Sequence, residues 1–291
     1  MRALSAEPAS AASGYPQSTP GRGNCEDSPN GSPLDRFPGL AVRIVDDAAG
    51  LQHLRGTRID RLVAAQGHAT CPPGTVPWGG GAGFTGGVAG AGNGINTSAP
   101  TGNGWEGRYN NSSTRLDDHF AVDAICARQP AGYTTTFTTV DNPAGARPAA
   151  VAVCPAGTRL FSGGTLSTAD TTDVQLLSAW PLGPQRFKSV MWNGSATGQR
   201  LTTFAVCGHR PAGYAITSAI GSDTGGPDTL AGGAQCPAGT SILGGGIHVT
   251  SPRPAVTLGA SLDEPSTQWL SEVVNSATEP ATVTISAICA A

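Results

Sequence analysis

The chain has 291 residues, of which 38% are apolar and 13% charged, and its net charge is −3. This is enough apolar content for buried cores, while the slightly negative charge gives no electrostatic footprint for nucleic acid. No segment approaches the 20 or so consecutive apolar residues of a membrane-spanning helix, so we expect no membrane insertion. The 41 glycines and 23 prolines favour short strands and many turns over long helices.

The first 39 residues are rich in Ser, Pro, Gly and Ala, and large apolar side chains are almost absent before Leu34. Such a segment cannot bury enough surface to stay ordered, so residues 1–39 are predicted to be a disordered tail. They contain no apolar run long enough for a signal-peptide core. Next, residues 40–45 have the composition of a strand, and residues 46–66 show a partial helical periodicity that Gly50 and Gly56 weaken.

Three copies of one pattern fill the rest of the chain. Each copy opens on a Cys-Pro-Ala-Gly-Thr phrase, at Cys71 (with Pro73 in place of Ala), Cys154 and Cys236. Each closes on an Ala-x-Cys phrase that ends at Cys126, Cys207 or Cys289. The opening cysteines lie 83 and 82 residues apart, a regularity that indicates an internal repeat.

Six of the seven cysteines occupy equivalent positions in the repeats, and Cys25 is left over. Six cysteines allow 15 connectivities, but only pairing within each repeat treats the three copies alike. We therefore expect Cys71–Cys126, Cys154–Cys207 and Cys236–Cys289. Loops of this length would stabilise each unit by roughly 4 kcal/mol in the chain-entropy model. Such bonds persist in oxidising compartments, which favours an extracellular or cell-surface location. The export route stays open, since a wrongly assigned start, a non-classical pathway or reduced cysteines would each fit.

Within each repeat the sequence predicts five or six short strands. A Pro-Ala-Gly-Tyr phrase starts the linkers at 130–133 and 211–214, and a strand follows each tyrosine. After the opening cysteine, a turn leads into a strand that carries glycines at 79–81, 163–164 and 244–246, a sign of a bulge or a close backbone approach.

Two later strands show which side faces a core. A large, small, large alternation predicts one buried face at the positions Trp105, Gly107, Tyr109; Phe187, Ser189, Met191; and Trp269, Ser271, Val273. The last strand carries apolar residues on the face of the closing cysteine, which should point inward.

The expected fold class is therefore all-β, with three tandem disulfide-bridged antiparallel units at 40–128, 129–209 and 210–291. The units could be small separate sandwiches, or they could close around a pseudo-threefold axis as a β-prism. The nearly equal linkers between the repeats suit both arrangements.

Two short motifs suggest chemistry. Asp223-Thr-Gly-Gly-Pro227 is one substitution from the phrase around a trypsin-like nucleophile and contains an aspartic-protease triplet. No histidine lies in a protease-like context and no second triplet exists, so a turn is the better interpretation. Gly81 to Gly86 matches the dinucleotide pattern Gly-x-Gly-x-x-Gly, but no helical pattern follows it.

Metal and cofactor sites are not expected. The cysteines are too widely spaced for a Cys-x-x-Cys ligand pair, and the five histidines occupy non-equivalent repeat positions. Two tryptophans occur only in the middle repeat: Trp192 on the outer side of a strand and Trp180 before a proline in a predicted loop. They are the candidate stacking platform for a sugar or a partner protein.

The Cys-Pro-Ala-Gly-Thr phrase, the glycine run, the central aromatic and the Ala-Ile-Cys ending resemble a module of secreted bacterial proteins, including domains that follow collagen-like stretches. The resemblance covers residues 129–291 well and 67–128 less well, because the first copy has Pro73 and a glycine-rich insert at 86–94. It implies an extracellular, non-enzymatic β module, and no specific activity comes with it. A bacterial origin also fits the presence of a single lysine among 17 basic residues.

We therefore expect a secreted, non-catalytic binding or structural protein of the cell surface, which recognises glycan or protein through the loops of its repeated β units. Two alternatives stay open: a secreted hydrolase of the serine-protease type, and a subunit or adaptor of a larger secreted assembly. The sequence specifies neither the ligand nor the oligomeric state.

Overall fold

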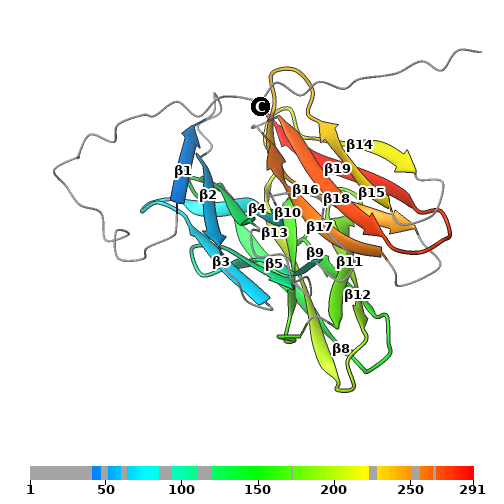
Figure 1. The fold of residues 1–291 in the computed structure, drawn as a ribbon. Helices are drawn as coiled ribbons and strands as arrows, with labels where there is room; N and C mark the ends of the chain where they lie inside the picture. Colours follow the sequence, from blue (N-terminus) through cyan, green and yellow to red (C-terminus); the bar gives the residue numbers. More distant parts are fainter. Residues whose placement is uncertain are drawn as a thin grey trace, which may run out of the picture. The chain divides into compact units, whose positions relative to one another are not determined.

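The computed structural model describes residues 41–46, 52–59, 64–84, 94–110, 119–171, 173–222, 228–250, 256–264 and 267–291. The predicted tail at 1–39 and Cys25 lie outside this part of the chain. Residues Gly39–Ala291 form one compact unit. Within the described ranges every regular element is a β-strand, and none is a helix, which confirms the all-β class (Figure 1).

The strands follow the sequence repeats. The first unit, at 40–128, begins with an additional strand, β1 (Ala41–Asp46). The first repeat then supplies β2 (Gln52–Ile59), β3 (Ala64–Thr70), β4 (Val76–Phe84), β5 (Gly94–Thr101), β6 (Gly104–Asn110) and β7 (His119–Ala127). The second supplies β8 (Thr134–Asn142), β9 (Ala149–Val153), β10 (Thr158–Ser167), β11 (Val174–Pro181), β12 (Arg186–Asn193) and β13 (Gln199–His209). The third supplies β14 (Ala215–Ser222), β15 (Asp228–Gln235), β16 (Ser241–Thr250), β17 (Val256–Glu264), β18 (Gln268–Asn275) and β19 (Thr282–Ala290).

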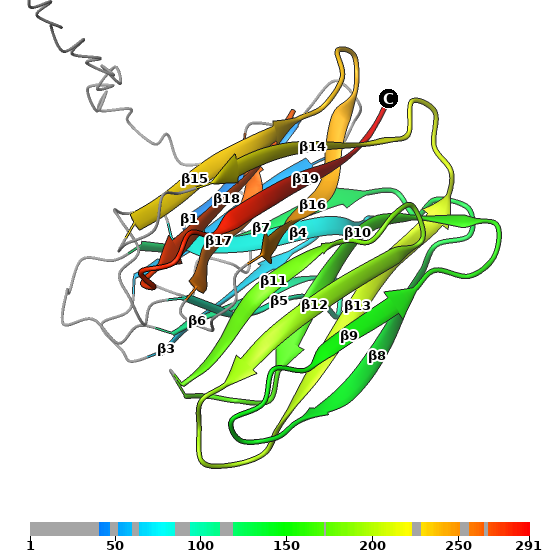
Figure 2. The ribbon, with the colours of Figure 1, turned by 90° about the vertical axis from the view of Figure 1, so that its right-hand side faces the viewer.

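Each repeat divides into two antiparallel half-sheets of three strands. In the second repeat, one half-sheet has the order β8-β13-β10 and the other has the order β9-β12-β11. The first and third repeats divide in the same way, with β1 added to the outer side of β2. The two half-sheets of a repeat pack on each other, so each repeat is a small two-layer unit (Figure 2).

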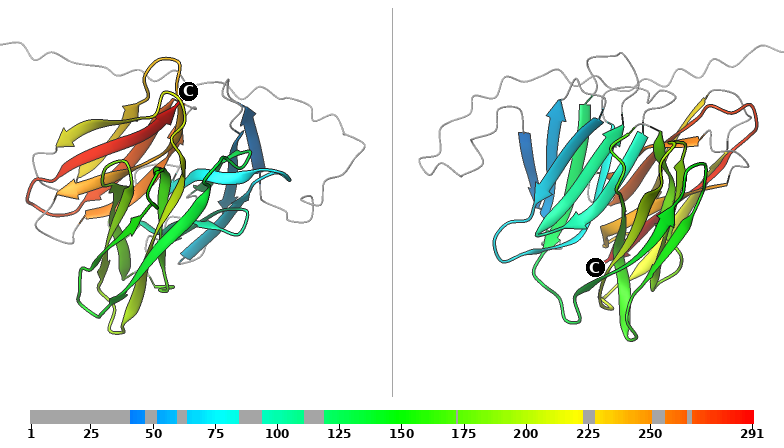
Figure 3. Two further views of the ribbon diagram at one scale, coloured as in Figure 1. Left: turned by 180° about the vertical axis from the view of Figure 1, so that it is seen from behind. Right: turned by 90° about the horizontal axis from the view of Figure 1, so that it is seen from below.

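The half-sheets of different repeats are joined in a cycle. The third strand of each repeat pairs with the fourth strand of a neighbour: β10 with β5, β16 with β11, and β4 with β17. The result is three sheets that each contain strands of two repeats: sheet A (β1-β2-β7-β4-β17-β18-β15), sheet B (β3-β6-β5-β10-β13-β8) and sheet C (β14-β19-β16-β11-β12-β9). Because the third repeat pairs back onto the first, the arrangement is the pseudo-threefold prism rather than a row of separate sandwiches (Figure 3).

The disulfides join Cys71 to Cys126, Cys154 to Cys207 and Cys236 to Cys289, as the repeat symmetry predicts. Each opening cysteine directly follows the second strand of its repeat, and each closing cysteine lies in the sixth strand. These two strands belong to different half-sheets. Every disulfide therefore ties together the two layers of one repeat.

The glycine run in the third strand explains how the repeats approach one another. At its first position, a Cβ on Gly79 would overlap the carbonyl oxygen of Leu243, and one on Gly244 would meet Ser162, so the three third strands converge on the pseudo-threefold axis. At the second position, Gly80, Gly163 and Gly245 pack against the central aromatic ring of their own repeats. At the third position, Gly81, Gly164 and Gly246 face the backbone of the fourth strand of a neighbouring repeat.

The predicted inner faces are buried. The alternating large and small residues of β6, β12 and β18 all lie in the interior, and so do the residues on the closing-cysteine face of β7, β13 and β19. Buried apolar residues from all three repeats form one continuous cluster.

Two tyrosines of the Pro-Ala-Gly-Tyr phrases link successive repeats. The Tyr133 hydroxyl donates to the carbonyl oxygen of Pro77 (2.7 Å), and the Tyr214 hydroxyl donates to that of Leu160 (2.9 Å). Each acceptor precedes the bulged residue of a third strand in the preceding repeat. Burial raises the pKa of both phenols, that of Tyr214 to about 12.

The helical interpretation is wrong for residues 52–59 and 64–66, which lie in strands, whereas the strand predicted at 40–45 is present as β1. Residues 52–59 pair along their whole length with β7, and residues 64–70 pair with β6. These pairings supply the neighbours that β8 and β9 supply in the second repeat. Tertiary pairing has overridden a weak local periodicity.

Replacing the third glycine of the run should destabilise the fold. A Cβ on Gly164 would lie 2.6 Å from the carbonyl oxygen of Ser98 and 2.7 Å from Cα of Ala99. Because backbone rather than a flexible side chain must move, Gly164→Ala is expected to lower the free energy of unfolding by about 1–3 kcal/mol. Gly198→Ala is the control, since no atom lies within 4 Å of its added Cβ, and it should change stability by no more than about 1 kcal/mol. Urea unfolding measures both, and equal effects would contradict the close approach.

The raised pKa of Tyr214 makes stability depend on alkaline pH. The phenol has a pKa of 10.0 when unfolded and about 12 when folded, so its contribution is complete below pH 10 and is lost as the pH rises towards 12. The stability difference between the wild type and Tyr214→Phe should therefore shrink between these two pH values. Urea unfolding at pH 9, 10 and 11 measures this difference, and a constant difference would show that the phenol does not titrate as described.

Candidate functional site

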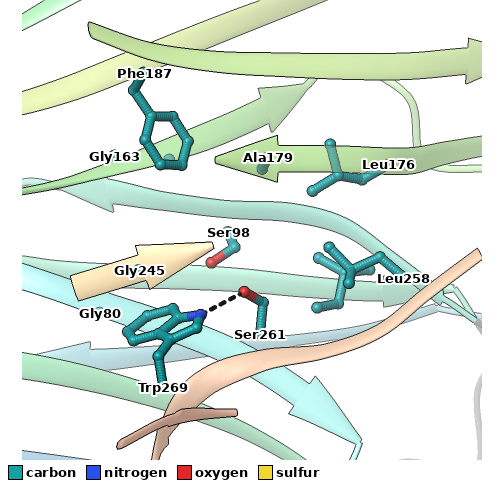
Figure 4. A pocket seen from close by; sticks show the side chains of 12 residues that line it. Gly80, Ser98, Gly163, Leu176, Ala179, Phe187, Gly245, Leu258, Ser261 and Trp269 are labelled. Atoms are coloured by element: carbon teal, nitrogen blue, oxygen red, sulfur yellow. Dashed lines mark hydrogen bonds between the residues drawn. The ribbon is translucent and has the colours of Figure 1, made fainter. Parts of the chain in front are cut away.

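An internal cavity lies where the three repeats meet. It is lined by the second glycines Gly80, Gly163 and Gly245, by the apolar side chains Ile95, Leu176 and Leu258, and by the ring of Trp269 (Figure 4). Its volume of about 20 Å³ has room for one water molecule and for no organic ligand. The cavity is a packing feature of the axis and does not qualify as a binding site.

The polar groups around this cavity change in step between repeats. The indole N–H of Trp105 donates to Ser98 Oγ (3.0 Å), and that of Trp269 donates to Ser261 Oγ (2.9 Å, Figure 4). In the second repeat the equivalent ring is Phe187, which has no donor, and the equivalent of the serine is Ala179. A buried indole N–H needs an acceptor, so the serine accompanies the tryptophan and disappears with it.

The candidate Trp180 does not lie in an exposed loop. It belongs to β11, is 9% exposed, and pairs across the strands with Lys188. The imidazole of His248 stacks on the Trp180 ring at 4.3 Å between centroids, and Lys188 Nζ lies 5.2 Å from the same ring. A residue before proline is extended, and here it continues a strand that pairs with β12. The ring of Trp180 is therefore in contact with His248 and Lys188 and is not an open stacking surface.

The second candidate, Trp192, lies where the sequence predicts it, on the outer face of β12, and is partly exposed. Alternation places Arg186, Lys188 and Val190 on the same face, and together these four residues form what we call the β12 strip. Arg186 is exposed, and Lys188 and Val190 are partly exposed. At about 3.3 Å per residue the strip is roughly 20 Å long.

The β12 strip carries the positive charges of Arg186 and Lys188, and the acidic residue Asp173 lies near its Trp192 end, where the Asp173 carbonyl oxygen accepts from the Gly194 amide (2.8 Å). Beside it, β9 contributes Ala149 and Val151 as the partners of Val190 and Lys188. Burial and the charge of Lys188 lower the pKa of His248, which is therefore neutral at pH 7. At the equivalent positions of the first repeat, by contrast, Glu106 and Arg108 form an ion pair with each other (2.6 Å).

The other sequence motifs do not assemble into a site. Gly81–Phe84 lie inside β4, in the middle of sheet A, where Gly81 contacts the backbone of β17; this agrees with the structural interpretation of the glycine pattern. The segment 223–227, which contains the protease-like phrase, lies outside the described residues. Within the ranges that the structure describes, no three metal-ligating side chains come together, and no helix is long and apolar enough to span a membrane.

No protein-family model matches the chain, and no curated protein shows significant similarity to it. The structure itself shows three repeated disulfide-bridged units, and disulfides of this kind are typical of proteins that reside in an oxidising environment.

Sequence reasoning found the two tryptophans but missed the residues around them. Lys188 is the only lysine of the chain, and its alternation with Phe187 already assigned it to the outer face. That signal could have joined Arg186, Lys188 and Trp192 into one strip. His248, by contrast, reaches Trp180 through the pairing of Ala179 with Ile247 across two repeats, which no local pattern reveals.

The serine–indole pair can be tested by a double-mutant cycle. Ser261→Ala leaves the buried N–H of Trp269 without its acceptor and should cost about 1–3 kcal/mol of unfolding free energy. Trp269→Phe removes the donor, so Ser261→Ala should cost much less in that background. The two variants together reproduce the Phe187 and Ala179 pair of the second repeat. Urea unfolding of the four proteins measures the coupling, and additive effects would mean that the hydrogen bond contributes nothing.

Proposed function

We propose that this protein is a secreted, non-catalytic binding protein of the cell surface, and that the β12 strip of sheet C recognises an acidic glycan. The observation that carries the proposal is the contrast between interior and surface. The interior positions repeat three times, whereas the combination of Arg186, Lys188 and Trp192 occurs in one repeat. A scaffold that keeps its core and varies one face is the expected form of a recognition module.

The chemistry of the strip fits an extended acidic polysaccharide. Arg186 and Lys188 are alternate residues of β12, so they supply two positive charges about 7 Å apart along the strand. Trp192 adds an aromatic surface against which the apolar face of a sugar ring can pack. Lys188 Nζ already lies over the Trp180 ring, 5.2 Å from its centroid, and this contact limits the entropy that the lysine loses when it binds. A location outside the cell fits both the disulfides and this ligand class.

Binding of the purified protein to a panel of acidic and neutral polysaccharides tests the proposal. We expect retention on uronic-acid polymers, weaker retention as salt rises, and none on neutral glucans. Arg186→Ala combined with Lys188→Ala should reduce affinity about 10-fold or more, and Trp192→Ala should reduce it through lost stacking. Arg128→Ala together with Arg200→Ala is the charge-matched control, because both residues are exposed, Arg128 directly follows β7 of sheet A and Arg200 lies in β13 of sheet B.

The result can also be followed at His248. A carboxylate bound beside Lys188 would offset the positive charge that lowers the pKa of the imidazole, so that pKa should rise on binding. Histidine resonances titrated with and without the polysaccharide measure this shift. Failure of every acidic polymer to bind, or equal loss in the control variant, would overturn the proposal.

A further inference from the structure

The strand β14 (Ala215–Ser222) forms one edge of sheet C, with β19 as its neighbour in the sheet (Figure 2). All eight of its residues pair with β19 in an unbroken register, without a bulge. The strand contains no proline and no ionisable side chain, and Ile220 is 77% exposed. Natural edge strands usually carry charges, prolines or bulges that prevent further pairing. β14 has none of these protections.

The first repeat shows what fits on such an edge. There β2 occupies the position that β14 occupies in the third repeat, since Gln52 pairs with Cys126 as Ala215 pairs with Cys289. On its outer side β2 carries β1, which pairs with it antiparallel over six consecutive residues (Figure 3). The first repeat therefore accommodates an additional antiparallel strand at the edge that is equivalent to the β14 edge of the third repeat.

We propose that β14 is an interface between two copies of this chain, which pair antiparallel about a twofold axis through Ser218. The strand reads Ala-Ile-Thr-Ser-Ala-Ile-Gly-Ser, and the residues on either side of Ser218 are complementary when two copies pair antiparallel. Each Ile216 then lies opposite the partner's Ile220, and each Thr217 lies opposite the partner's Ala219. Pairs of β-branched side chains across antiparallel strands stabilise a sheet, and the same patch serves both copies, as a twofold interface requires.

The other free edge of the same type fits less well. β8 (Thr134–Asn142) carries the charged Asp141 within the strand, and its exposed Phe137 already leans on Phe204, with the ring centroids 6.0 Å apart. Pairing of two β8 strands would therefore add two carboxylates to the interface. β14 brings no charge and leaves its isoleucine without a neighbouring ring.

Two eight-residue strands bury less surface than a standard protein interface, so the dimer should be weak and should form as concentration rises. This defines the measurements. Sedimentation of the full chain should show a shift from 29.2 kDa towards twice that mass at high protein concentration. Ile220→Lys should keep the chain monomeric, since it places a charge in the interface at a position that is exposed in the monomer. Phe137→Lys adds the same charge on β8 and should leave the dimer intact.

Cross-linking tests the register. In a Cys25→Ser background, Ser218→Cys places two thiols directly opposite each other across the twofold axis, within the Cα separation that a disulfide requires. Ile220→Cys places them four residues out of register, roughly 13 Å apart along the strand. We expect the disulfide-linked dimer to form at least 10-fold faster with Ser218→Cys. Equal rates, preferential cross-linking through Phe137→Cys, or a wild-type chain that stays at 29.2 kDa would overturn the proposal.

Discussion

The fold depends on one constraint, the approach of backbone to backbone where the three repeats meet. A strand that pairs with a neighbouring repeat while crossing the axis has little room for side chains on either face at the crossing. Gly79, Gly80 and Gly81 satisfy this in the first repeat, and Gly244 to Gly246 do so in the third. In the second repeat, Ser162 takes the first place, and its buried hydroxyl has no hydrogen-bond partner. That one exception shows how little room the axis leaves.

Around this centre, each repeat is closed by its own means. A disulfide ties the two layers, an aromatic ring fills the space between them, and in the first two repeats a tyrosine from the next repeat holds the start of the glycine strand. These devices recur at equivalent positions and serve architecture. The surface is under no such constraint, so charge and aromatic character differ from sheet to sheet, from the ion pair of Glu106 and Arg108 on sheet B to the β12 strip on sheet C.

Much of this architecture could be predicted from the sequence, because three copies of one pattern check one another. The equivalent positions of the cysteines predicted the disulfide pairs, and the alternation of large and small residues predicted the buried faces of β6, β12 and β18. The choice between sandwiches and a prism could not be predicted, since it depends on bridges such as Thr165 with Ser98 that join residues of different repeats. The placement of Trp180 failed for a related reason. Its ring is stacked against His248, which belongs to another repeat and reaches it only in the assembled fold.

The cyclic pairing of the repeats also fixes their number. In a solenoid each added unit stacks on the last, so the array can grow or shrink while every unit keeps the same kind of contact. Here β4 of the first repeat is completed by β17 of the last, and deletion of any copy would leave two half-sheets facing solvent. A fourth copy would have to open the glycine crossing and enlarge the centre. Gene duplication could therefore extend this fold to three repeats, at which point every third strand is paired with a neighbouring repeat and the cycle is closed.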